Sequence, residues 1–398
     1  MNKFVIVGGG TAGWLTALTI NKMSPYADVT VISSEEIGIL GAGEGVTPHF
    51  NMLMEQLKIP LEGIFKNAKA TVKSGIKFIN WNGDGESYIH PFWNGKTALH
   101  FDAALLANHL KGIAVERGVH HIDGIVKKIN NKSYNNDIES FELEDGTIVE
   151  TNFVFDCSGL HRLIIGKHYN TPWVDYSDSL PCSRALPFFI QHNDDVTGGQ
   201  YTEAIAMKAG WIWKIPVQGR YGCGYVFDKR FITDEEAKAE VCEMFGDVVF
   251  PRVFDFSAGC YEKTWVNNCV AIGLSSGFTE PLEATSIWIQ ILSLWHYIGR
   301  EPSFAQDRNV ERWYSVYVSS MNTYMKDFIH AHYLSKRNDS EFWRTFRDVN
   351  VTPEYVTDVK SIDEIEQHHL KYFIELHKMY YESPIVPESW NVILNGTR

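Results

Sequence analysis

The first residues with a chemically informative spacing are three glycines near the N-terminus. Gly8, Gly10 and Gly13 form the pattern Gly-x-Gly-x-x-Gly between an apolar run and an amphipathic segment. In such a place glycine permits a tight turn, close approach of backbone N–H groups to a pyrophosphate, and close packing of a helix on a strand. We therefore predict a dinucleotide site that includes Gly8, Gly10, Thr11, Ala12 and Gly13.

The ribose end of this site is not fixed by the sequence. A dinucleotide fold usually has an acidic residue at the end of its second strand, where the residue binds the ribose hydroxyls. Here Ser33 ends the strand-like run that begins at Asp28, and Glu35 and Glu36 follow just beyond it. Either glutamate could bind the ribose, or the Ser33 hydroxyl could bind it directly.

Three further glycine-containing segments adjoin predicted strands. Residues 38–48 read GILGAGEGVTP, residues 156–166 read DCSGLHRLIIG, and residues 268–286 read NCVAIGLSSGFTEPLEATS. The first segment could close over a cofactor as a flexible loop, or it could be a plain connection. These segments are spread over much of the chain, which favours FAD lying extended over one domain. An NAD site is usually concentrated in one contiguous half of the chain. The predicted contacts are Gly41, Ala42, Gly43, Glu44, Asp156, Gly273 and Gly277.

The composition is that of an acidic globular protein. The 398 residues are 44% hydrophobic and 21% charged, and their formal net charge of -13 argues against binding to nucleic acid. Six cysteines show neither a CxxC pair nor metal-ligand spacing, so we expect buried thiols, a reducing compartment and no metal site. The N-terminus has no leader features, and no run of about 18 apolar residues occurs. We therefore expect a cytoplasmic protein without membrane contact.

The order of strand-like and helix-like segments predicts an α/β fold. The glycine turn and the following helix lie between two buried strands, in a βαβ unit of about 30 residues. Further strands are predicted at residues 75–81, 140–143, 153–156, 222–228 and 269–273, with a hairpin turn at Asp145-Gly146. After residue 281 the chain changes to long amphipathic segments, which predict helices at residues 310–335 and 362–381.

An ordered series of motifs runs through most of the chain. It comprises GGGTAGW at 8–14, GAGEGVTP at 41–48, ATVKSGIKFINW at 70–81, YIHPF at 88–92, FDCSG at 155–159, DYSDSLPC at 175–182, GWIWKIP at 210–216, GYVFDKRF at 224–231, WVNNCVAIGLSSGFTEPLEATS at 265–286, DFIHAHY at 327–333 and RNDSEFW at 337–343. Through this series the chain resembles the flavin-dependent halogenases of the tryptophan halogenase family over residues 1–345. The pattern WxWxIP, together with the N-terminal glycines, makes the resemblance specific.

The resemblance implies a fold and a division of the chain. The fold is an FAD-binding, Rossmann-like α/β fold of the glutathione-reductase and aromatic-hydroxylase type, with mixed sheets and a helical C-terminal region that covers the substrate. Residues 1–300 would form the FAD-binding halogenase core with interleaved substrate-site elements. Residues 301–398 would form a mainly helical region packed on that core.

The resemblance also implies a two-component halogenase. A separate NAD(P)H-dependent flavin reductase would supply FAD as FADH2, and FADH2, O2 and a halide ion would together yield hypohalous acid. The oxidant would travel through the protein to a lysine beside a small, electron-rich aromatic substrate. A homodimer or a higher oligomer stays open.

Two residues match the family's reacting groups. Lys73, in ATVK, matches the catalytic lysine, which holds and polarises the oxidant. Glu283, in EPLEATS, matches the acidic residue that accompanies the lysine and can take the proton released by the ring. Stabilising the dipole of the following helix is the alternative role for Glu283. Lys77, four residues after Lys73, is expected to face solvent.

Further residues match the family's halide and substrate positions. Thr285 and Ser286 stand where the family binds halide, largely through backbone N–H groups near a helix N-terminus. The family's usual Ser-Thr-Gly is replaced here by Ala284-Thr285-Ser286, so a halide larger than chloride stays open. His90 and Phe92 match the residues that stack on the indole in tryptophan-specific members; packing in a core is the alternative.

The segment GWIWKIP contains two tryptophans at alternate positions. Trp211 and Trp213 would lie on one face of a strand. On its own this periodicity favours core packing. With the resemblance, we interpret the two indoles as a barrier that keeps an organic substrate away from the flavin while a small halide reaches it.

The segments that surround the substrate in the tryptophan-specific members are shorter here. Only a short bridge separates Phe92 from His100, where those enzymes have a substantial insertion. Near the C-terminus, Tyr380, Tyr381 and Glu382 resemble a remnant of the segment that holds the amino-acid backbone. Our hypothesis is that the enzyme accepts indoles and other electron-rich arenes, and that free tryptophan is a poor substrate.

Two other classes of protein stay open. The glycine segments alone would equally suit an FAD-dependent aromatic monooxygenase or a flavin-binding protein without activity. Lys73 and the paired tryptophans favour the halogenase, because a hydroxylating enzyme needs its substrate beside the flavin. The presence of both Lys73 and Glu283 disfavours the inactive protein.

Overall fold

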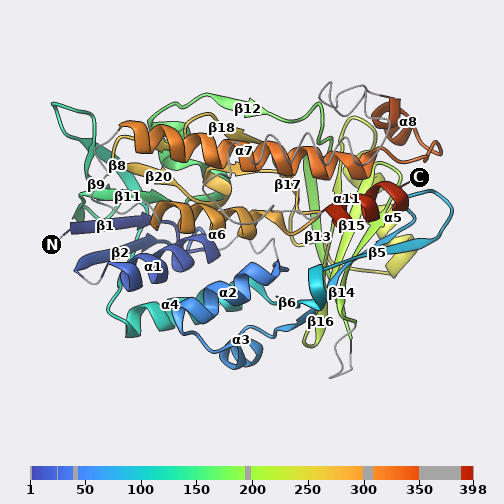
Figure 1. Ribbon diagram of the computed structural model, residues 1–398, viewed down its shortest axis with the longest axis horizontal. Helices are drawn as coiled ribbons and strands as arrows, with labels where there is room; N and C mark the ends of the chain where they lie inside the picture. Colours follow the sequence, from blue (N-terminus) through green and yellow to red (C-terminus); the bar gives the residue numbers. More distant parts are fainter. Residues whose placement is uncertain are drawn as a thin grey trace. The chain divides into compact units, whose positions relative to one another are not determined.

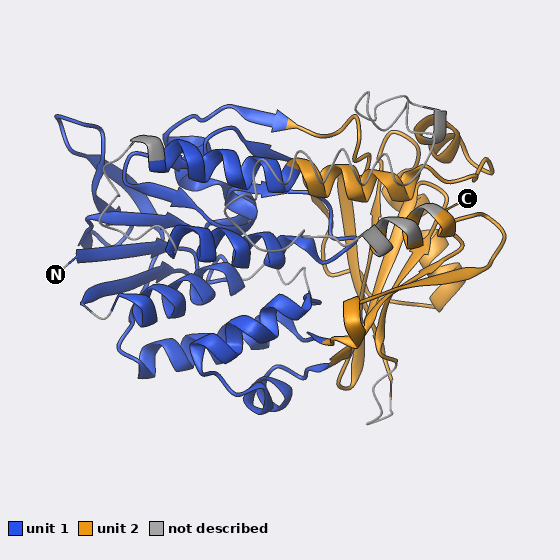
Figure 2. Cartoon of the chain, viewed as in Figure 1, with its two compact units in different colours: residues 1–71, 98–174, 259–322 blue, residues 72–97, 175–258, 323–398 orange. Residues whose placement is uncertain are grey.

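The computed structural model describes residues 2–24, 26–38, 44–192, 199–298, 308–348 and 387–397 of the chain. The chain forms two compact units, each built from several separate stretches of sequence (Figure 2). Unit 1 contains residues 1–71, 98–174 and 259–322, and unit 2 contains residues 72–97, 175–258 and 323–398.

Unit 1 is built on a six-stranded sheet. Its strands are, in spatial order, β19 (Trp265–Val266), β20 (Cys269–Ala271), β11 (Phe153–Asp156), β1 (Asn2–Val7), β2 (Ala27–Ser33) and β7 (His120–Asp123). All neighbours pair in parallel except β19 with β20. The apolar residues of β1 are buried, as expected of a parallel strand that is covered on both faces.

Unit 1 also contains further helices and strands. They are α1 (Thr11–Met23), α2 (Pro48–Leu57), α3 (Leu61–Asn67), α4 (Ala103–Glu116), α6 (Thr285–Ile298), β6 (Ala98–His100), β8 (Val126–Asn131), β9 (Ile138–Leu143), β10 (Ile148–Glu150), β18 (Gly259–Tyr261), β21 (Gly277–Phe278), the short 3-10 helices η2 (Gly159–His161) and η4 (Gly273–Ser275) and the short π-helix η3 (Leu163–His168). Helix α7 (Arg308–Tyr333) begins in unit 1 and ends in unit 2.

Different layers cover the two faces of the six-stranded sheet (Figure 1). On one face Phe153 and Phe155 pack against Tyr297 of α6, with ring centres 5.7 and 5.1 Å apart. On the other face a buried apolar cluster joins β1 and β11 to η3 and to the three-stranded sheet of β8, β9 and β10. The carboxyl ends of β1 and β11, where the glycine segments follow, are thereby held in fixed positions.

Unit 2 is built on a seven-stranded sheet. Its strands are, in spatial order, β17 (Phe254–Asp255), β13 (Arg184–Gln191), β16 (Arg220–Phe227), β15 (Gly210–Val217), β14 (Tyr201–Ala206), β4 (Gly75–Ile79) and β5 (Ser87–Pro91). Strands β4 and β14 pair in parallel, and the other neighbours pair antiparallel. The strand with the two tryptophans, β15, lies in the interior of this sheet.

Helices cover both faces of the seven-stranded sheet. Successive residues of a strand point to opposite faces, so the register places Phe78 and Phe188 on opposite sides. Helix α5 (Asp234–Phe245) packs through Phe245 on Phe188, with ring centres 5.7 Å apart. The last part of α7 packs through His332 on Phe78, at 5.0 Å.

Most predicted elements are confirmed, with ends that differ by a few residues. The hairpin turn lies at Gly146, which has a φ of 88°, and α7 confirms the helix predicted at residues 310–335. The helix predicted at residues 362–381 lies outside the described residues, as do Tyr380, Tyr381 and Glu382. The division into residues 1–300 and 301–398 stays a prediction.

Five of the six cysteine thiols are buried, as expected, and Cys242 is partly exposed. Among the helices of the described residues, none is long and apolar enough to span a membrane.

Candidate active site

The glycine turn joins β1 to α1 as the motif predicts. Gly8 has a φ of 122°, and a Cβ atom there would lie 2.2 Å from the carbonyl oxygen of Cys157. A Cβ atom on Gly13 would lie 1.8 Å from the carbonyl oxygen of Gly8, whereas one on Gly10 would meet nothing within 4 Å. The fold therefore requires glycine at positions 8 and 13, and Gly10 borders open space in which a ligand can approach the backbone.

The start of α1 fits the phosphates of a dinucleotide. Gly10 is the N-cap residue and has no side chain to bond the first N–H groups of the helix, so Thr11 and Ala12 present backbone donors. Gly273 of η4 lies beside this turn, because its Cβ position is 3.0 Å from the Cβ of Ala12. The structure thus brings the glycine turn and Gly273 together.

Asp156, at the end of β11, is fully engaged by its own loop. One oxygen accepts hydrogen bonds from the backbone N–H and the hydroxyl of Ser158, at 3.1 and 2.6 Å. The other accepts from the N–H groups of Ile164 and Ile165, at 2.9 Å each. Because a carboxylate has about four acceptor positions, these four bonds use Asp156 to hold its own loop, and its assignment as a cofactor contact stays a prediction.

Two neighbouring contacts refine the other glycine assignments. The N–H of Gly159 donates to the hydroxyl of Ser275 at 2.9 Å, which ties η2 to η4. A Cβ atom on Gly277 would lie 2.7 Å from Oδ1 of Asn322 and 2.8 Å from the Cβ of Cys260. Close packing therefore accounts for glycine at position 277, where the sequence predicts a cofactor contact.

The loop before α2 is described only in part. Gly41, Ala42 and Gly43 lie outside the described residues. Glu44 is buried, and its carbonyl oxygen accepts a hydrogen bond from the N–H of Phe101 at 2.9 Å. Its assignment as a cofactor contact stays a prediction.

The segment that matches the halide site is a strained turn at the start of α6. Glu280 and Ala284 have φ values of 57° and 55°, in the left-handed region that non-glycine residues avoid. Thr285, the first residue of α6, is buried, and its hydroxyl lies 3.2 Å from that of Thr279. Ser286 follows in the first turn, where the N–H groups lack partners within the helix and favour an anion.

Replacing Ala284 with glycine is expected to stabilise the protein. Glycine adopts a positive φ without the steric cost of a Cβ atom, which is worth about 1 kcal/mol of unfolding free energy. Valine at the same position should destabilise by at least as much, because a branched side chain suits this backbone least. Chemical denaturation measures both changes. Equal unfolding free energies for the glycine and valine variants would contradict the left-handed geometry of this turn.

Lys73 lies at the end of β3 (Thr71–Lys73) and is 1% exposed. Its ammonium nitrogen is 5.6 Å from the ring centre of Phe92. The N–H of Phe92 donates to the carbonyl oxygen of Ser74 at 3.0 Å, which holds the ring nearby. Burial disfavours a charged ammonium, and the face of an aromatic ring favours it. The structure thus brings two of the predicted site residues, Lys73 and Phe92, together.

Lys77 lies in different surroundings. It pairs in register with Glu203 of β14, which forms an ion pair with Lys214 at 3.0 Å. The register puts these three residues on the face of the sheet opposite to Phe78 and Trp213. All three charged side chains are partly exposed, so Lys77 is a solvent-accessible lysine close in sequence to a buried one.

His90 of β5 is held by the helix α11 (Pro387–Gly396). Its Nε2 atom lies 2.8 Å from the hydroxyl oxygen of Ser389, and its ring lies edge-on to that of Phe328 at 5.9 Å. A Cβ atom on Gly396 would lie 2.6 Å from the ring of Tyr88, so α11 packs closely on the same strand. The orientation of His90 therefore depends on the last helix of the chain.

The two tryptophans of β15 lie on the sheet face that also bears His90. Trp211 is buried, Trp213 is partly exposed, and their ring centres are 6.4 Å apart. The residues opposite Trp213 on the neighbouring strands are Ala204 and Gly224. A Cβ atom on Gly224 would lie 2.1 Å from the indole. The adjacent strands thus leave the room that a large ring at position 213 needs.

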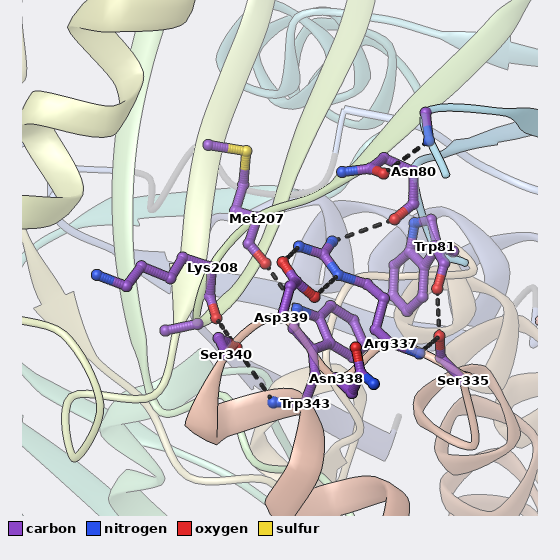
Figure 3. A network of polar contacts seen from close by, with 12 residues as sticks. Asn80, Trp81, Met207, Lys208, Ser335, Arg337, Asn338, Asp339, Ser340 and Trp343 are labelled. Atoms are coloured by element: carbon purple, nitrogen blue, oxygen red, sulfur yellow. Dashed lines mark hydrogen bonds and ion pairs between the residues drawn. The ribbon is translucent and has the colours of Figure 1, made fainter. Parts of the chain in front are cut away.

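A buried polar network holds the turn before β15 (Figure 3). The guanidinium of Arg337 lies over the ring of Trp343, 4.7 Å from its centre. The indole N–H of Trp343 donates to the carbonyl oxygen of Met207 at 2.8 Å, and the hydroxyl of Ser340 donates to that of Lys208 at 2.6 Å. Both carbonyl groups belong to the turn between β14 and β15. The motif RNDSEFW therefore fixes the strand that presents the tryptophans.

Two residues beside the predicted site have no signal in the sequence. Ser389 contacts His90 across 299 positions of the chain. The Nε2 atom of His121 lies 2.9 Å from the hydroxyl oxygen of Ser33. The sequence contains 15 histidines and does not single this one out. Only the packing of α11 on β5 and the pairing of β2 with β7 reveal these contacts.

The predicted site residues divide between the two units. Those in unit 1 are Gly8, Gly10, Thr11, Ala12, Gly13, Glu44, Asp156, Gly273, Gly277, Glu283, Thr285 and Ser286. Those in unit 2 are Lys73, His90, Phe92, Trp211 and Trp213. In the part of the chain that the structure describes, no group of three or more His, Cys, Asp or Glu side chains is placed to hold a metal ion.

Comparison with known proteins gives consistent matches along the chain. A family model described as "Tryptophan halogenase" matches residues 3–97 and 93–397. The tryptophan 7-halogenase RebH of Lentzea aerocolonigenes is 32% identical, over 88% of this chain and 80% of the relative. The structure of the tryptophan 6-halogenase SttH from Streptomyces toxytricini is similar at a TM-score of 0.89 and 28% identity, over 100% of this chain and 90% of that one. BrvH, a flavin-dependent halogenase from Brevundimonas sp. BAL3, gives a TM-score of 0.86 and 28% identity, over 100% and 89% of the two chains.

Proposed function

Because the chain belongs to the tryptophan halogenase family and is a flavin-dependent halogenase, we propose that it uses FADH2, O2 and a halide ion to halogenate an electron-rich aromatic substrate at Lys73. The observation that carries this proposal is the buried ammonium of Lys73 beside the ring of Phe92. A lysine is costly to bury, and this one lies in the unit whose sheet presents the two tryptophans.

In this proposal the residues of unit 1 bind the cofactor and the halide. The N–H groups of the glycine turn and of the first turn of α1 bind the pyrophosphate of FAD, and Gly10 leaves the space that the phosphates need. When bound, reduced flavin would supply two electrons to O2, and the halide would supply two more as it is oxidised to hypohalous acid. The N–H groups at Thr285 and Ser286 hold the halide at the positive end of α6.

Lys73 receives the oxidant. Its ammonium donates a hydrogen bond to the oxygen of hypohalous acid, which polarises the oxygen–halogen bond and directs the halogen to the ring. The ring of Phe92 stabilises the charged ammonium in its buried position. Glu283, which is 8% exposed, accepts the proton that the substrate loses when its aromaticity is restored.

Trp211 and Trp213 exclude the organic substrate from the flavin. In this proposal the two large rings bar an arene from the flavin and let only a halide or a hypohalous acid molecule pass. The small residues opposite Trp213 and the network around Arg337 keep the indoles in place. We expect replacement of either tryptophan by alanine to disturb folding or coupling before it creates monooxygenase activity.

The proposed substrate is an indole or another electron-rich arene that stacks beside His90 and Phe92. The bridge between Phe92 and His100 is short, so the pocket lacks a large insertion that would restrict it to one amino acid. Free tryptophan is expected to be a poor substrate. A separate flavin reductase supplies FADH2.

Replacing Ser389 with alanine is expected to raise the KM for indole about fivefold and to leave kcat nearly unchanged. The hydroxyl holds His90 through one hydrogen bond, worth about 1 kcal/mol. Ser389→Thr, which keeps the hydroxyl, is the matched control and should keep the wild-type KM. Steady-state kinetics measure both. An unchanged KM in Ser389→Ala would contradict the role of this bond in substrate binding.

The function is tested by incubating the protein with FAD, a flavin reductase, NADH and one of three halides, with indole, phenol or free tryptophan as substrate. Halogenated indole or phenol, identified by mass spectrometry, is the expected result. Strong turnover of tryptophan with refusal of indole and phenol would contradict the proposed substrate class. Hydroxylated products without halogen would identify an FAD-dependent aromatic monooxygenase instead.

A further inference from the structure

At the carboxyl end of β2 the structure has a serine and a histidine where a dinucleotide fold usually has an acid. Ser33 is the last residue of β2, and its hydroxyl oxygen lies 2.9 Å from Nε2 of His121 in β7. The carbonyl oxygen of Ser33 accepts a hydrogen bond from the N–H of Gly124 at 2.8 Å. The ring of His121 packs against Trp14 of α1, with ring centres 5.5 Å apart. The pair is therefore held by both strands and by the helix.

Ser33 lies directly against the glycine turn. A Cβ atom on Gly9 would lie 2.5 Å from the Cβ and 2.6 Å from the hydroxyl oxygen of Ser33. The next residue, Gly10, borders open space, so the Ser33 hydroxyl stands at the edge of the space that this turn offers to a dinucleotide. Whichever atom donates in the bond to His121, a serine hydroxyl retains hydrogen-bonding capacity for a ligand.

The pair is uncharged at neutral pH. Burial, and then the positive charge of Lys111, lower the pKa of His121, against smaller opposing effects of Asp123 and Glu35. The imidazole is therefore neutral at pH 7. A ligand at Ser33 meets a neutral hydroxyl supported by a neutral ring.

The two glutamates that the sequence leaves as alternatives are both exposed beyond the end of β2. The carboxylate of Glu35 lies 3.7 Å from the ammonium of Lys111 and is 81% exposed. Glu36 is exposed, and its N–H donates to the hydroxyl of Ser34 at 3.2 Å. Of the three candidates, Ser33 is the one that lies against the glycine turn.

We propose that Ser33, supported by His121, makes the contact with the ribose in the adenosine half of FAD, and that this neutral contact discriminates weakly between FAD and FMN. The inference rests on the proposed use of FAD. A carboxylate accepts charge-assisted hydrogen bonds from both ribose hydroxyls, whereas a serine hydroxyl makes one weaker bond. Because this contact is weak, the adenosine half of FAD adds little affinity in this chain. FMN lacks that half and should therefore bind nearly as tightly as FAD. A loosely held adenosine suits an enzyme that takes up reduced flavin and releases oxidised flavin at each turnover.

The test compares the dissociation constants of FAD and FMN, measured by flavin fluorescence, in the wild-type protein and three variants. Ser33→Ala and His121→Leu should each lower the ratio of the FMN constant to the FAD constant about threefold, and Ser33→Glu should raise it about tenfold. The constant for FMN itself should stay unchanged in all three. Ser34→Ala is the matched control. The Ser34 hydroxyl accepts a hydrogen bond from the N–H of Glu36, and successive side chains of an extended segment point to opposite sides.

The ratio distinguishes this inference from the proposed function. An unchanged ratio in Ser33→Ala and His121→Leu, with thermal stability equal to the wild type, would overturn the inference while leaving halogenation intact. A change of the same size in Ser34→Ala would also overturn it. Failure of the wild-type protein to bind either flavin would contradict the proposed function, and the inference with it.

Discussion

Replacing Lys73 with methionine is expected to lower halogenation about a thousandfold or more while the oxidation of FADH2 by O2 continues. Lys73 is buried beside Phe92, and methionine fills nearly the same volume, so the change leaves no large cavity. What is removed is the ammonium group that holds and polarises the oxidant. The measurement is the amount of halogenated indole formed per NADH consumed by the reductase.

The matched control is Lys77→Met. Lys77 lies four residues along the chain, on a partly exposed face of the sheet beside Glu203. Its loss should change the yield of product by about twofold at most, because surface charges contribute little to a distant reaction. Wild-type yield in Lys73→Met, or an equal loss in Lys77→Met, would contradict the assignment of Lys73 as the group that receives the oxidant.

Alanine at position 13 and alanine at position 10 are expected to have opposite consequences. At Gly13 the new Cβ atom would lie 1.8 Å from the carbonyl oxygen of Gly8, so α1 has to move away from β1. We expect a loss of about 3 kcal/mol of unfolding free energy. At Gly10 the new atom meets no neighbour within 4 Å, and the unfolding free energy should change by about 0.5 kcal/mol or less.

The cost at Gly10 should appear in flavin binding. A Cβ atom there occupies space proposed for the pyrophosphate, so the dissociation constant for FAD should rise about tenfold. Chemical denaturation and flavin titration of the two variants separate the effects. If Gly10→Ala binds FAD as tightly as the wild type, the pyrophosphate does not lie at this turn. If it loses as much stability as Gly13→Ala, the open space around Gly10 is contradicted.

The strands and glycine turns could be predicted because their signals are local. Few other structures fit a buried apolar run followed by Gly8, Gly10 and Gly13. Glycine is required at position 13 by the nearby carbonyl oxygen of Gly8, and at position 8 by the adjacent loop that contains Cys157. The spacing of Trp211 and Trp213 alone predicts that they share one face of a strand, and the register of β15 with β14 confirms this.

The contacts of the Asp156 carboxylate and the close packing at Gly277 could not be predicted in the same way. The sequence shows that Asp156 ends a strand before a glycine, but not that its carboxylate bonds Ser158, Ile164 and Ile165. Likewise, glycine at position 277 is explained by Asn322, which arrives from a helix 45 residues later. Such contacts depend on tertiary packing, which no local pattern contains.

The side chains that hydrogen-bond to His90 and Ser33 could not be predicted either, for the same reason. Each site residue could be located from its place in a motif or at the end of a strand. The side chains that orient them, Ser389 and His121, come from elements that only the folded topology brings near. A sequence therefore indicates where a chemical group stands more readily than what holds it in position.

We propose that the halogen reaches the substrate at Lys73 and that the substrate does not meet the flavin. A mass-spectrometric comparison of the wild type and Lys73→Met, each incubated with FAD, a flavin reductase, NADH, bromide and indole, tests this proposal. Monobrominated indole, with the isotope pair of bromine, should form in the wild type alone, and neither protein should form hydroxylated indole. Hydroxyindole formed equally by both proteins, without bromine in the product, would rule the proposal out.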